Sequence, residues 1–140
     1  MTLIEKYNTP FQGLVSSLLN DNMHSIPALE HSLNSLPKVN LLEDINGFNI
    51  QLAAPGLNKK DFKIDLNNRV LTISVNLENN EKQNFIKKEF NYDSFTRSFN
   101  LPEIVKLEKI NATYNDGILN IEIPKKDEAK PIPPKTIKIS

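Results

Sequence analysis

Few side chains in this sequence could carry out catalysis or hold a metal ion. The chain of 140 residues has no cysteine and only two histidines, His24 and His31, with Glu30 beside the second. A metal site needs several clustered ligands, and catalysis needs a nucleophile with a positioned base. The sequence also lacks a phosphate-binding loop, a dinucleotide glycine pattern and a serine elbow. We therefore expect no enzyme, and no catalytic, cofactor-binding or metal-binding residues.

Binding chemistry is more evident at Ile137 and Ile139, which follow a proline-rich, charged segment and precede only Ser140. A segment of this composition cannot form its own core, so both side chains are buried on another surface or left in water. In an extended strand residues i and i+2 project to one side, and Lys138 then faces the other side. The spacing favours a strand that docks on another sheet. The alternative is a frayed terminus with chance isoleucines.

A short amphipathic helix is predicted near the N-terminus. Thr9 is a suitable N-cap, with Pro10 at the first helical position and Gln12 at the third. One apolar stripe then follows at helical spacing: Phe11, Leu14, Val15, Leu18 and Leu19. Because so short a helix is marginal in water, it either packs on its own domain or contacts other chains.

From Pro37 to Pro124 the hydrophobic period is two instead of helical. Strands are predicted at residues 39–41, 48–52, 62–66, 71–75, 84–90, 94–101, 109–114 and 118–123. Four residue pairs can supply the positive φ of tight turns: Asn46-Gly47, Pro55-Gly56, Asn67-Asn68 and Asp116-Gly117. About eight short strands with no convincing helix between them predict an all-β antiparallel sandwich.

The connection between Val75 and Phe95 is unusually long for a compact domain. It is rich in Asn, Glu, Lys and Gln, and the pattern tightens briefly at Phe85–Phe90, within the strand predicted at Asn84–Phe90. One interpretation is a solvated surface loop. The other is a strand that pairs with a neighbouring protomer and covers an otherwise unpaired sheet edge.

The charges of the chain are balanced, with 17 Lys and Arg against 17 Asp and Glu. No overall field would draw it to nucleic acid or to an anionic membrane. No segment approaches the roughly 20 apolar residues that span a bilayer, and the N-terminus does not resemble a signal peptide. We expect protein partners, no nucleic acid, no stable membrane association and a cytoplasmic location.

Four motifs together resemble those of the small heat shock proteins, the α-crystallin-domain family. Residues 112–119 are similar to the family signature A-x-x-x-n-G-v-L, with Ala112, Gly117 and Leu119 at its fixed positions. Residues 52–57 resemble the PG turn, and residues 94–102 resemble S-F-x-R-x-F-x-L-P. The Ile-x-Ile tail is the fourth motif. The resemblance covers residues 37–140.

The resemblance implies an immunoglobulin-like antiparallel sandwich at residues 37–124, the α-crystallin domain. An apolar, partly helical N-terminal arm (1–36) would precede it and an extended tail (125–140) would follow it. Protomers would form dimers by exchanging the strand at Asn84–Phe90, and dimers would build a larger homo-oligomer. The implied function is that of an ATP-independent holdase, which binds partly unfolded clients under stress without a cofactor.

The resemblance also implies roles for individual residues. The tail would dock in a groove between residues 62–66 and 107–113, lined by Phe62, Ile64 and Leu66, for which ordinary core packing is the alternative. The expected dimer interface comprises Phe85, Ile86, Glu89 and Arg97. Arg97 matches an arginine that forms interface ion pairs in the family, and its alternative is a surface position. The apolar stripe of the N-terminal arm would contact clients.

Two other functions compete with a holdase. A CS-type adaptor domain is a related sandwich that is typically monomeric and lacks both the exchanged strand and the Ile-x-Ile tail. A membrane-surface protein could use the N-terminal helix as an amphipathic anchor, although that helix lacks the basic face such anchors favour.

Overall fold

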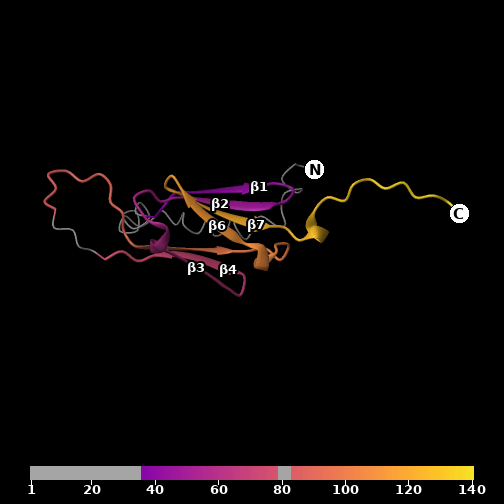
Figure 1. Ribbon diagram of the computed structural model, residues 1–140, viewed down its shortest axis with the longest axis horizontal. Coiled ribbons are helices and arrows are strands. Elements are labelled where there is room, and N and C mark those ends of the chain that lie inside the picture. The colour runs from indigo at the N-terminus through magenta and orange to yellow at the C-terminus, as the bar shows by residue number, and fades with distance from the viewer. Residues whose placement is uncertain (1–35, 79–82) are drawn as a thin grey trace, which may run out of the picture.

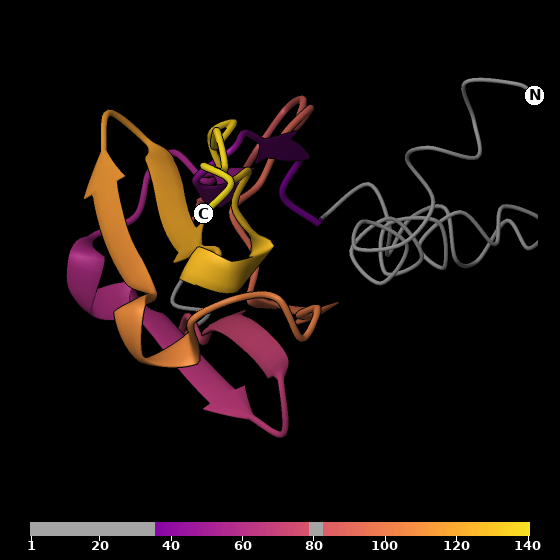
Figure 2. The ribbon, with the colours of Figure 1, turned by 90° about the vertical axis from the view of Figure 1, so that its right-hand side faces the viewer.

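The computed structural model describes residues 36–78 and 83–140. Its strands form two antiparallel sheets that pack face to face, as the two layers in Figures 1 and 2 show. The predicted all-β antiparallel sandwich is confirmed. The helix predicted in the N-terminal arm lies outside the described residues.

The larger sheet has four strands in the order β1-β2-β7-β6, and the smaller sheet has three in the order β3-β4-β5. The strands of the larger sheet are β1 (Val39–Glu43), β2 (Gly47–Ala53), β7 (Ile118–Pro124) and β6 (Asn111–Asn115). Those of the smaller sheet are β3 (Phe62–Asn67), β4 (Val70–Val75) and β5 (Phe95–Asn100). Within residues 36–78 and 83–140 the short 3-10 helices are η2 (Lys59–Asp61), η3 (Leu107–Lys109) and η4 (Asp127–Ala129).

The core lies between the two sheets and follows directly from the period of two. In β2, β4 and β7 every second side chain is buried, because alternate residues of a strand face opposite sides of the sheet. The buried core consists of Phe48, Ile50, Leu52, Leu71, Ile73, Val75, Phe95, Phe99, Leu101, Val105, Leu119, Ile121 and Ile123. Leu119 of the sequence signature is therefore a core residue.

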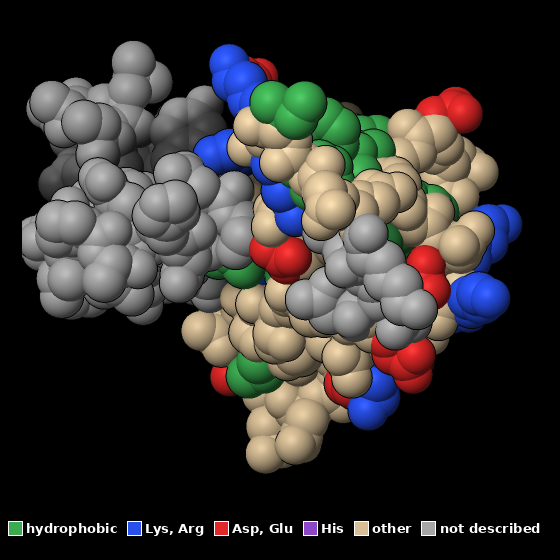
Figure 3. Space-filling model, turned by 90° about the vertical axis from the view of Figure 1, so that its left-hand side faces the viewer, with side chains coloured by type: hydrophobic (Ala, Val, Ile, Leu, Met, Phe, Trp, Pro, Cys, Tyr) green, Lys and Arg blue, Asp and Glu red, His purple; other side chains and the backbone are tan. Residues whose placement is uncertain are grey.

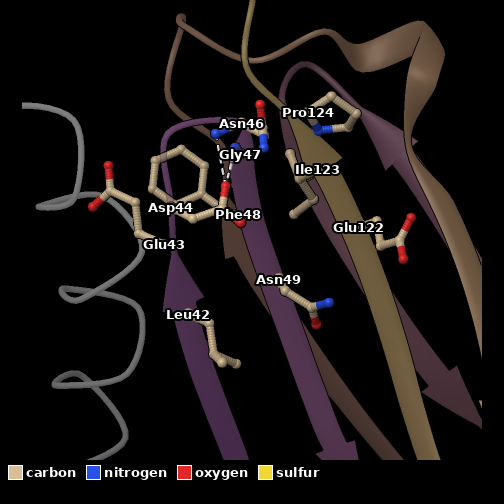
Figure 4. Close-up of a pocket in the computed structure, with 10 residues that line it drawn as sticks. All are labelled: Leu42, Glu43, Asp44, Asn46, Gly47, Phe48, Asn49, Glu122, Ile123 and Pro124. Carbon is tan, nitrogen blue, oxygen red and sulfur yellow. Dashed lines mark hydrogen bonds between the residues drawn. The ribbon is translucent and has the colours of Figure 1, made fainter. Parts of the chain in front are cut away.

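The turn between β1 and β2 is closed by a side chain and not by positive φ. The Asp44 carboxylate accepts hydrogen bonds from the backbone N–H groups of Asn46 (2.7 Å) and Gly47 (2.9 Å), drawn as dashed lines in Figure 4. Neither Asn46 nor Gly47 has positive φ, so that part of the turn prediction is wrong. A Cβ at Gly47 would lie 2.4 Å from the carbonyl oxygen of Ile123, so the glycine is required for space.

Two other hairpins do use left-handed backbone. Asp116 (φ 51°) and Gly117 (φ 79°) connect β6 to β7, as predicted. Between β3 and β4 the left-handed pair is Asn68 (φ 47°) and Arg69 (φ 63°), one residue later than predicted. The Arg69 guanidinium donates to the carbonyl oxygens of Leu101 and Pro102, which supports this unusual arginine conformation.

The strand predicted at Asn84–Phe90 is absent from the single chain. That segment is irregular and belongs to a long loop that projects from one end of the sandwich (Figure 1). A strand needs a neighbouring strand for its backbone hydrogen bonds, and within the described part of the chain no strand pairs with these residues. Figure 3 looks at that end and shows hydrophobic side chains gathered there.

The first residues after β7 remain bonded to the sandwich. The backbone N–H of Lys125 donates to the carbonyl of Asn46, and that of Lys126 donates to the carbonyl of Ile104, each at 2.7 Å. Residues 131–140 are all exposed and run away from the body of the molecule (Figure 1). No helix in residues 36–78 and 83–140 is long and apolar enough to cross a membrane.

Candidate functional site

One lateral edge of the sandwich is formed by β3 from the smaller sheet and β6 from the larger sheet. Each is the last strand of its sheet: β3 pairs with β4, and β6 pairs with β7. Among the described residues neither has a second strand partner, so one side of each backbone is open to a further chain. We call this the β3/β6 edge.

The aliphatic residues of β3 face the core but are incompletely covered. Ile64 lies opposite Ile73 and Leu66 lies opposite Leu71 in the strand register, and both partners are buried. Directly opposite residues project to the same face, so Ile64 and Leu66 point between the sheets. Nevertheless Leu66 is 40% exposed, and Ile64 is half-buried. The edge thus presents apolar surface that the chain does not cover.

The opposing strand explains this exposure. Ala112 of β6 lies opposite the buried Ile121, so its small side chain points inward, yet it is exposed. A larger residue here would cover the flank of the core, and alanine leaves it open. Beyond β6, Leu107 and Ile110 pack partly buried against the core. The role of Ala112 in the signature is therefore consistent with keeping the β3/β6 edge accessible.

One end of this edge is closed by an aromatic contact. The rings of Phe62 and Tyr114 lie 4.8 Å apart between centroids and join β3 to β6. The Tyr114 hydroxyl donates a 2.6 Å hydrogen bond to the carbonyl of Ala54, so the ring is fixed in place. Phe62 therefore forms the boundary of the apolar strip, while Ile64 and Leu66 form its open part.

The side chains of the tail are free to fill such a strip. Ile137 is 81% exposed and Ile139 is 99% exposed. Their i, i+2 spacing equals that of Ile64 and Leu66, so in extended conformation both pairs repeat at about 6.6 to 6.8 Å. The structure does not bring the two pairs together within one chain, since the tail extends away from the sandwich (Figure 1).

The projecting loop carries the second group of exposed apolar residues. Phe85, Ile86 and Phe90 are all exposed, and Phe90 lies 5.7 Å from Tyr92 between ring centroids. The Lys88 ammonium lies 5.1 Å from the Phe85 ring. The Glu89 carboxylate lies 2.8 Å from Lys87 Nζ, and both side chains are largely exposed.

Arg97 lies at the opposite lateral side of the sandwich from the β3/β6 edge. It projects from β5 on the same face as the buried Phe95 and Phe99, with its guanidinium carbon 5.8 Å from the Phe99 ring. Its Nη1 donates a 2.8 Å hydrogen bond to the carbonyl of Pro37, just before β1. This bond links β5 to the segment before β1, and no local sequence pattern indicates it because 60 residues separate the partners.

A hollow of about 350 Å³ lies at the β1–β2 turn (Figure 4). Its lining includes Leu42, Asn49 and Glu122 from three adjacent strands. The Asn49 side-chain oxygen is buried without a hydrogen-bond partner among the described residues. The hollow offers no convergent nucleophile and base. In the described residues no group of three or more His, Cys, Asp or Glu side chains could hold a metal ion.

Comparison with known proteins accounts for this arrangement. Residues 40–140 match the Hsp20/alpha crystallin family. The chain belongs to this family. The resemblance drawn from the sequence motifs is thereby confirmed, and membership of a family of chaperones supports a stress chaperone role. The monomeric adaptor has no support among the relatives described below.

Relatives of this small heat shock protein occur in Rickettsia felis. The chain is 36% identical to Small heat shock protein C2 over 100 residues, which cover 69% of this chain and 65% of that protein. It is 30% identical to Small heat shock protein C4 over 143 residues, which cover 96% of this chain and 86% of the relative. The chain thus spans just under two thirds of the length of the first relative.

Solved structures show the same fold. The small heat-shock protein from Xylella fastidiosa superposes with a TM-score of 0.61 at 27% identity, covering 75% of this chain and 96% of that one. The hspA protein from Xanthomonas axonopodis gives a TM-score of 0.58 at 29% identity, covering 65% and 94%. The crystal structure of the Xylella protein reveals a distinct high order structure.

Proposed function

We propose that this protein is an ATP-independent holdase that binds partly unfolded clients and prevents their aggregation. The observation that carries the proposal is the pairing of an open apolar edge with two exposed isoleucines of equal spacing. A large permanent apolar surface would make the chaperone itself aggregate. A strip that a tail can cover and uncover makes such surface available on demand.

The strength of a single contact favours reversibility. Burying an aliphatic side chain contributes about 1.5 to 3 kcal/mol before ordering costs. Two isoleucines on the β3/β6 edge therefore give a weak contact. In a closed assembly each further contact forms at high effective concentration, so many weak contacts hold the particle together. Heating that loosens them would release smaller species with uncovered edges.

We propose that protomers first pair through the projecting loop. Its residues Phe85, Ile86 and Phe90 are exposed in the single chain, and burial against a partner would remove this apolar surface from water. Pairing of Asn84–Phe90 with an edge strand of the partner would give the segment a neighbouring strand, which it does not have among the described residues. Glu89 and Arg97 remain our candidates for polar contacts in this interface.

Clients are proposed to bind the uncovered β3/β6 edge and the apolar stripe of the N-terminal arm, defined by Phe11, Leu14, Val15, Leu18 and Leu19. Partly unfolded chains expose extended apolar segments, which could add to an open sheet edge. The cytoplasm is the proposed compartment, because a chain without cysteine is suited to reducing conditions.

The test of holdase activity is the light scattering of a heat-labile client without ATP. The intact chain should suppress aggregation when client and chaperone are present at equal mass. No protection at that ratio would remove the functional proposal, whatever the fold.

The docking contact is tested by the double variant Ile137→Ala/Ile139→Ala. Its assemblies should be smaller than those of the unchanged chain in size-exclusion chromatography with light scattering. The matched control is Ile132→Ala, because Ile132 is also exposed (85%) but lies outside the i, i+2 pair. An equal effect of both changes would argue against specific docking.

A further inference from the structure

The direction of the C-terminal tail is fixed where it leaves the sandwich. Lys125 Nζ donates to Glu43 Oε1 at 2.8 Å and to the Asp44 carbonyl at 2.9 Å. Its side chain is only 11% exposed and that of Glu43 is 30% exposed, so water screens this pair less than a surface pair. The ammonium also lies 5.2 Å from the Phe48 ring. Lys125 is thus held on three sides by the β1–β2 turn.

Backbone and side-chain contacts also hold the residues that follow Lys125. Besides the bonds from Lys125 and Lys126 already described, Lys106 Nζ lies 3.1 Å from the Asp127 carboxylate. A turn of 3-10 helix at Asp127–Ala129 completes the segment. We call residues 125–129 the tail root.

The tail then continues as a stiff segment. Pro131, Pro133 and Pro134 have fixed φ, and Lys130, Ile132 and Pro133 each precede a proline and are thereby restricted to extended backbone. Residues 130–134 therefore form a rod, which we call the proline segment. At about 3.1 Å per residue it is roughly 15 Å long.

Length alone would let the tail reach the β3/β6 edge of its own chain. Lys106 contacts the tail root, and Ala112 of β6 lies only six residues later, at most about 21 Å away. The seven residues from Lys130 to Ile137 span about 22 Å at a polyproline rise. A flexible tail of this length could therefore cover its own edge.

Geometry prevents this return. The proline segment leaves the root pointing away from the sandwich (Figure 1). Only Lys135 and Thr136 then precede Ile137, and the three steps from Pro134 to Ile137 reach about 10 Å, which is shorter than the proline segment. Ile137 could return to its own edge only if the root rotated or the proline segment bent.

We propose that Lys125, Glu43 and the proline segment are positioning elements that prevent the tail from docking on the β3/β6 edge of its own chain. Ile137 and Ile139 consequently dock on a second copy of the chain. This inference rests on the proposed docking at that edge. It adds that the tail root, far from the docking residues, determines whether the tail docks on its own chain or on a neighbouring one.

Energy transfer between dyes tests this choice, and the absence of native cysteine makes labelling specific. Cysteines are placed by Asn67→Cys beside the edge and by Ser140→Cys beside the isoleucine pair. Doubly labelled chains diluted into excess unlabelled chain report docking within a chain. Singly labelled chains assembled together report docking between chains.

The unchanged sequence should show high transfer between chains and only low transfer within a chain. In Lys125→Gln, and in the triple variant Pro131→Ser/Pro133→Ser/Pro134→Ser, transfer within a chain should rise. Transfer between chains should fall at least roughly twofold, because a tail docked on its own edge acts at higher effective concentration than a neighbour. The mass of the assemblies should fall in parallel.

Two comparisons separate positioning from general destabilisation. Lys125→Arg keeps the charge and should preserve docking between chains. Lys38→Gln removes one exposed lysine charge just before β1, at the other end of the larger sheet from β6, and should leave both signals unchanged. The triple proline variant changes only exposed residues outside the sandwich, so its result does not depend on the stability of the fold.

Each remaining outcome is decisive. High transfer within the unchanged chain, or variants that still dock only between chains, would overturn the positioning role and leave the docking edge in place. Low transfer in both arrangements of the unchanged chain would overturn the docking edge as well, and the positioning role with it.

Discussion

Gly47 lies in a tight turn, but close packing against β7 and not the turn conformation requires a glycine there. Its φ is not positive, so other residues could adopt its backbone conformation. The constraint comes from the neighbouring strand, since a Cβ would lie 2.4 Å from the Ile123 carbonyl oxygen and 2.9 Å from Pro124 Cα. Backbone atoms of a paired strand cannot move aside as a flexible side chain can.

Gly47→Ala should therefore destabilise the fold, by about 1 to 3 kcal/mol as for other overpacked sites. Urea unfolding followed by circular dichroism measures the change. Gln51→Ala, on the same face of β2, is the matched control and should stay within about 0.5 kcal/mol. Equal stability of the two variants would show that β7 shifts without cost.

At the scale of elements, the hairpin of β3 and β4 combines two different environments. Leu66 and Leu71 lie directly opposite each other, but Leu66 is 40% exposed and Leu71 is 1% exposed. Leucine is thus used for the β3/β6 edge at position 66 and for the core at position 71. Substitutions at these two positions can therefore distinguish effects on assembly from effects on the free energy of unfolding.

Leu71→Ala should lower the free energy of unfolding by about 2 to 5 kcal/mol, because it leaves a cavity in the core. Leu66→Ala should cost much less stability, yet reduce the mass of the assemblies because it removes part of the docking surface. Urea unfolding and light scattering measure the two effects. A Leu66→Ala assembly of unchanged mass would count against the edge as a docking surface.

The tail root is expected to be insensitive to mild acid. The hydrogen bond from Lys106, and next its charge, hold the pKa of the Asp127 carboxyl below its ordinary value of 3.8, and Lys130 acts in the same direction. A carboxyl whose pKa is lowered in the folded state contributes stability above its unfolded pKa, and loses it as pH falls through the folded value. The contact should therefore persist at neutral pH and loosen only below 3.8.

NMR chemical shifts of the tail root, followed during acid titration, measure this transition. Asp127→Asn is the control and should abolish it. A transition of the Asp127 signals near neutral pH would contradict the expected direction.

The accuracy of the sequence interpretation differs between elements for physical reasons. Strands β2, β4 and β7 were predictable because alternation is a local pattern that burial on one face imposes. The segment Asn84–Phe90 lacks this strict alternation, and among the described residues no strand pairs with it. The displaced β3–β4 turn depends on hydrogen bonds from Arg69 to residues more than 30 positions away. For the candidate site, motif positions indicated Ile64 and Leu66, whereas the openness at Ala112 required the register of β6 and β7.

At the scale of the whole molecule, assembly should depend on apolar contacts more than on charge. The formal net charge is zero, and the residues proposed to dock are aliphatic. Neutral chains neither attract nor repel each other strongly over long distances. Temperature should therefore control the assembly more than ionic strength.

Raising the salt concentration from about 0.1 to about 0.5 M, which shortens the range of charge interactions, should leave the mass of the assemblies nearly unchanged. Cooling should lower it, because burial of apolar surface weakens at low temperature, and strong heating should lower it too, because the conformational entropy of the released tails then outweighs the contacts. Light scattering at several temperatures and salt concentrations measures both effects. Dissociation by salt at constant temperature would point to ion pairs as the main contacts.

The unpaired sides of β3 and β6 also affect how readily the protein itself could aggregate. An open strand can act as a template for the growth of cross-β fibrils. Charged and polar side chains on such a strand oppose this growth. Lys63, Asp65 and Thr113 occupy these positions here. Since a tail from another copy would cover the strands, protection rises with abundance. Dilution would therefore uncover the strands and leave Lys63, Asp65 and Thr113 as their remaining protection.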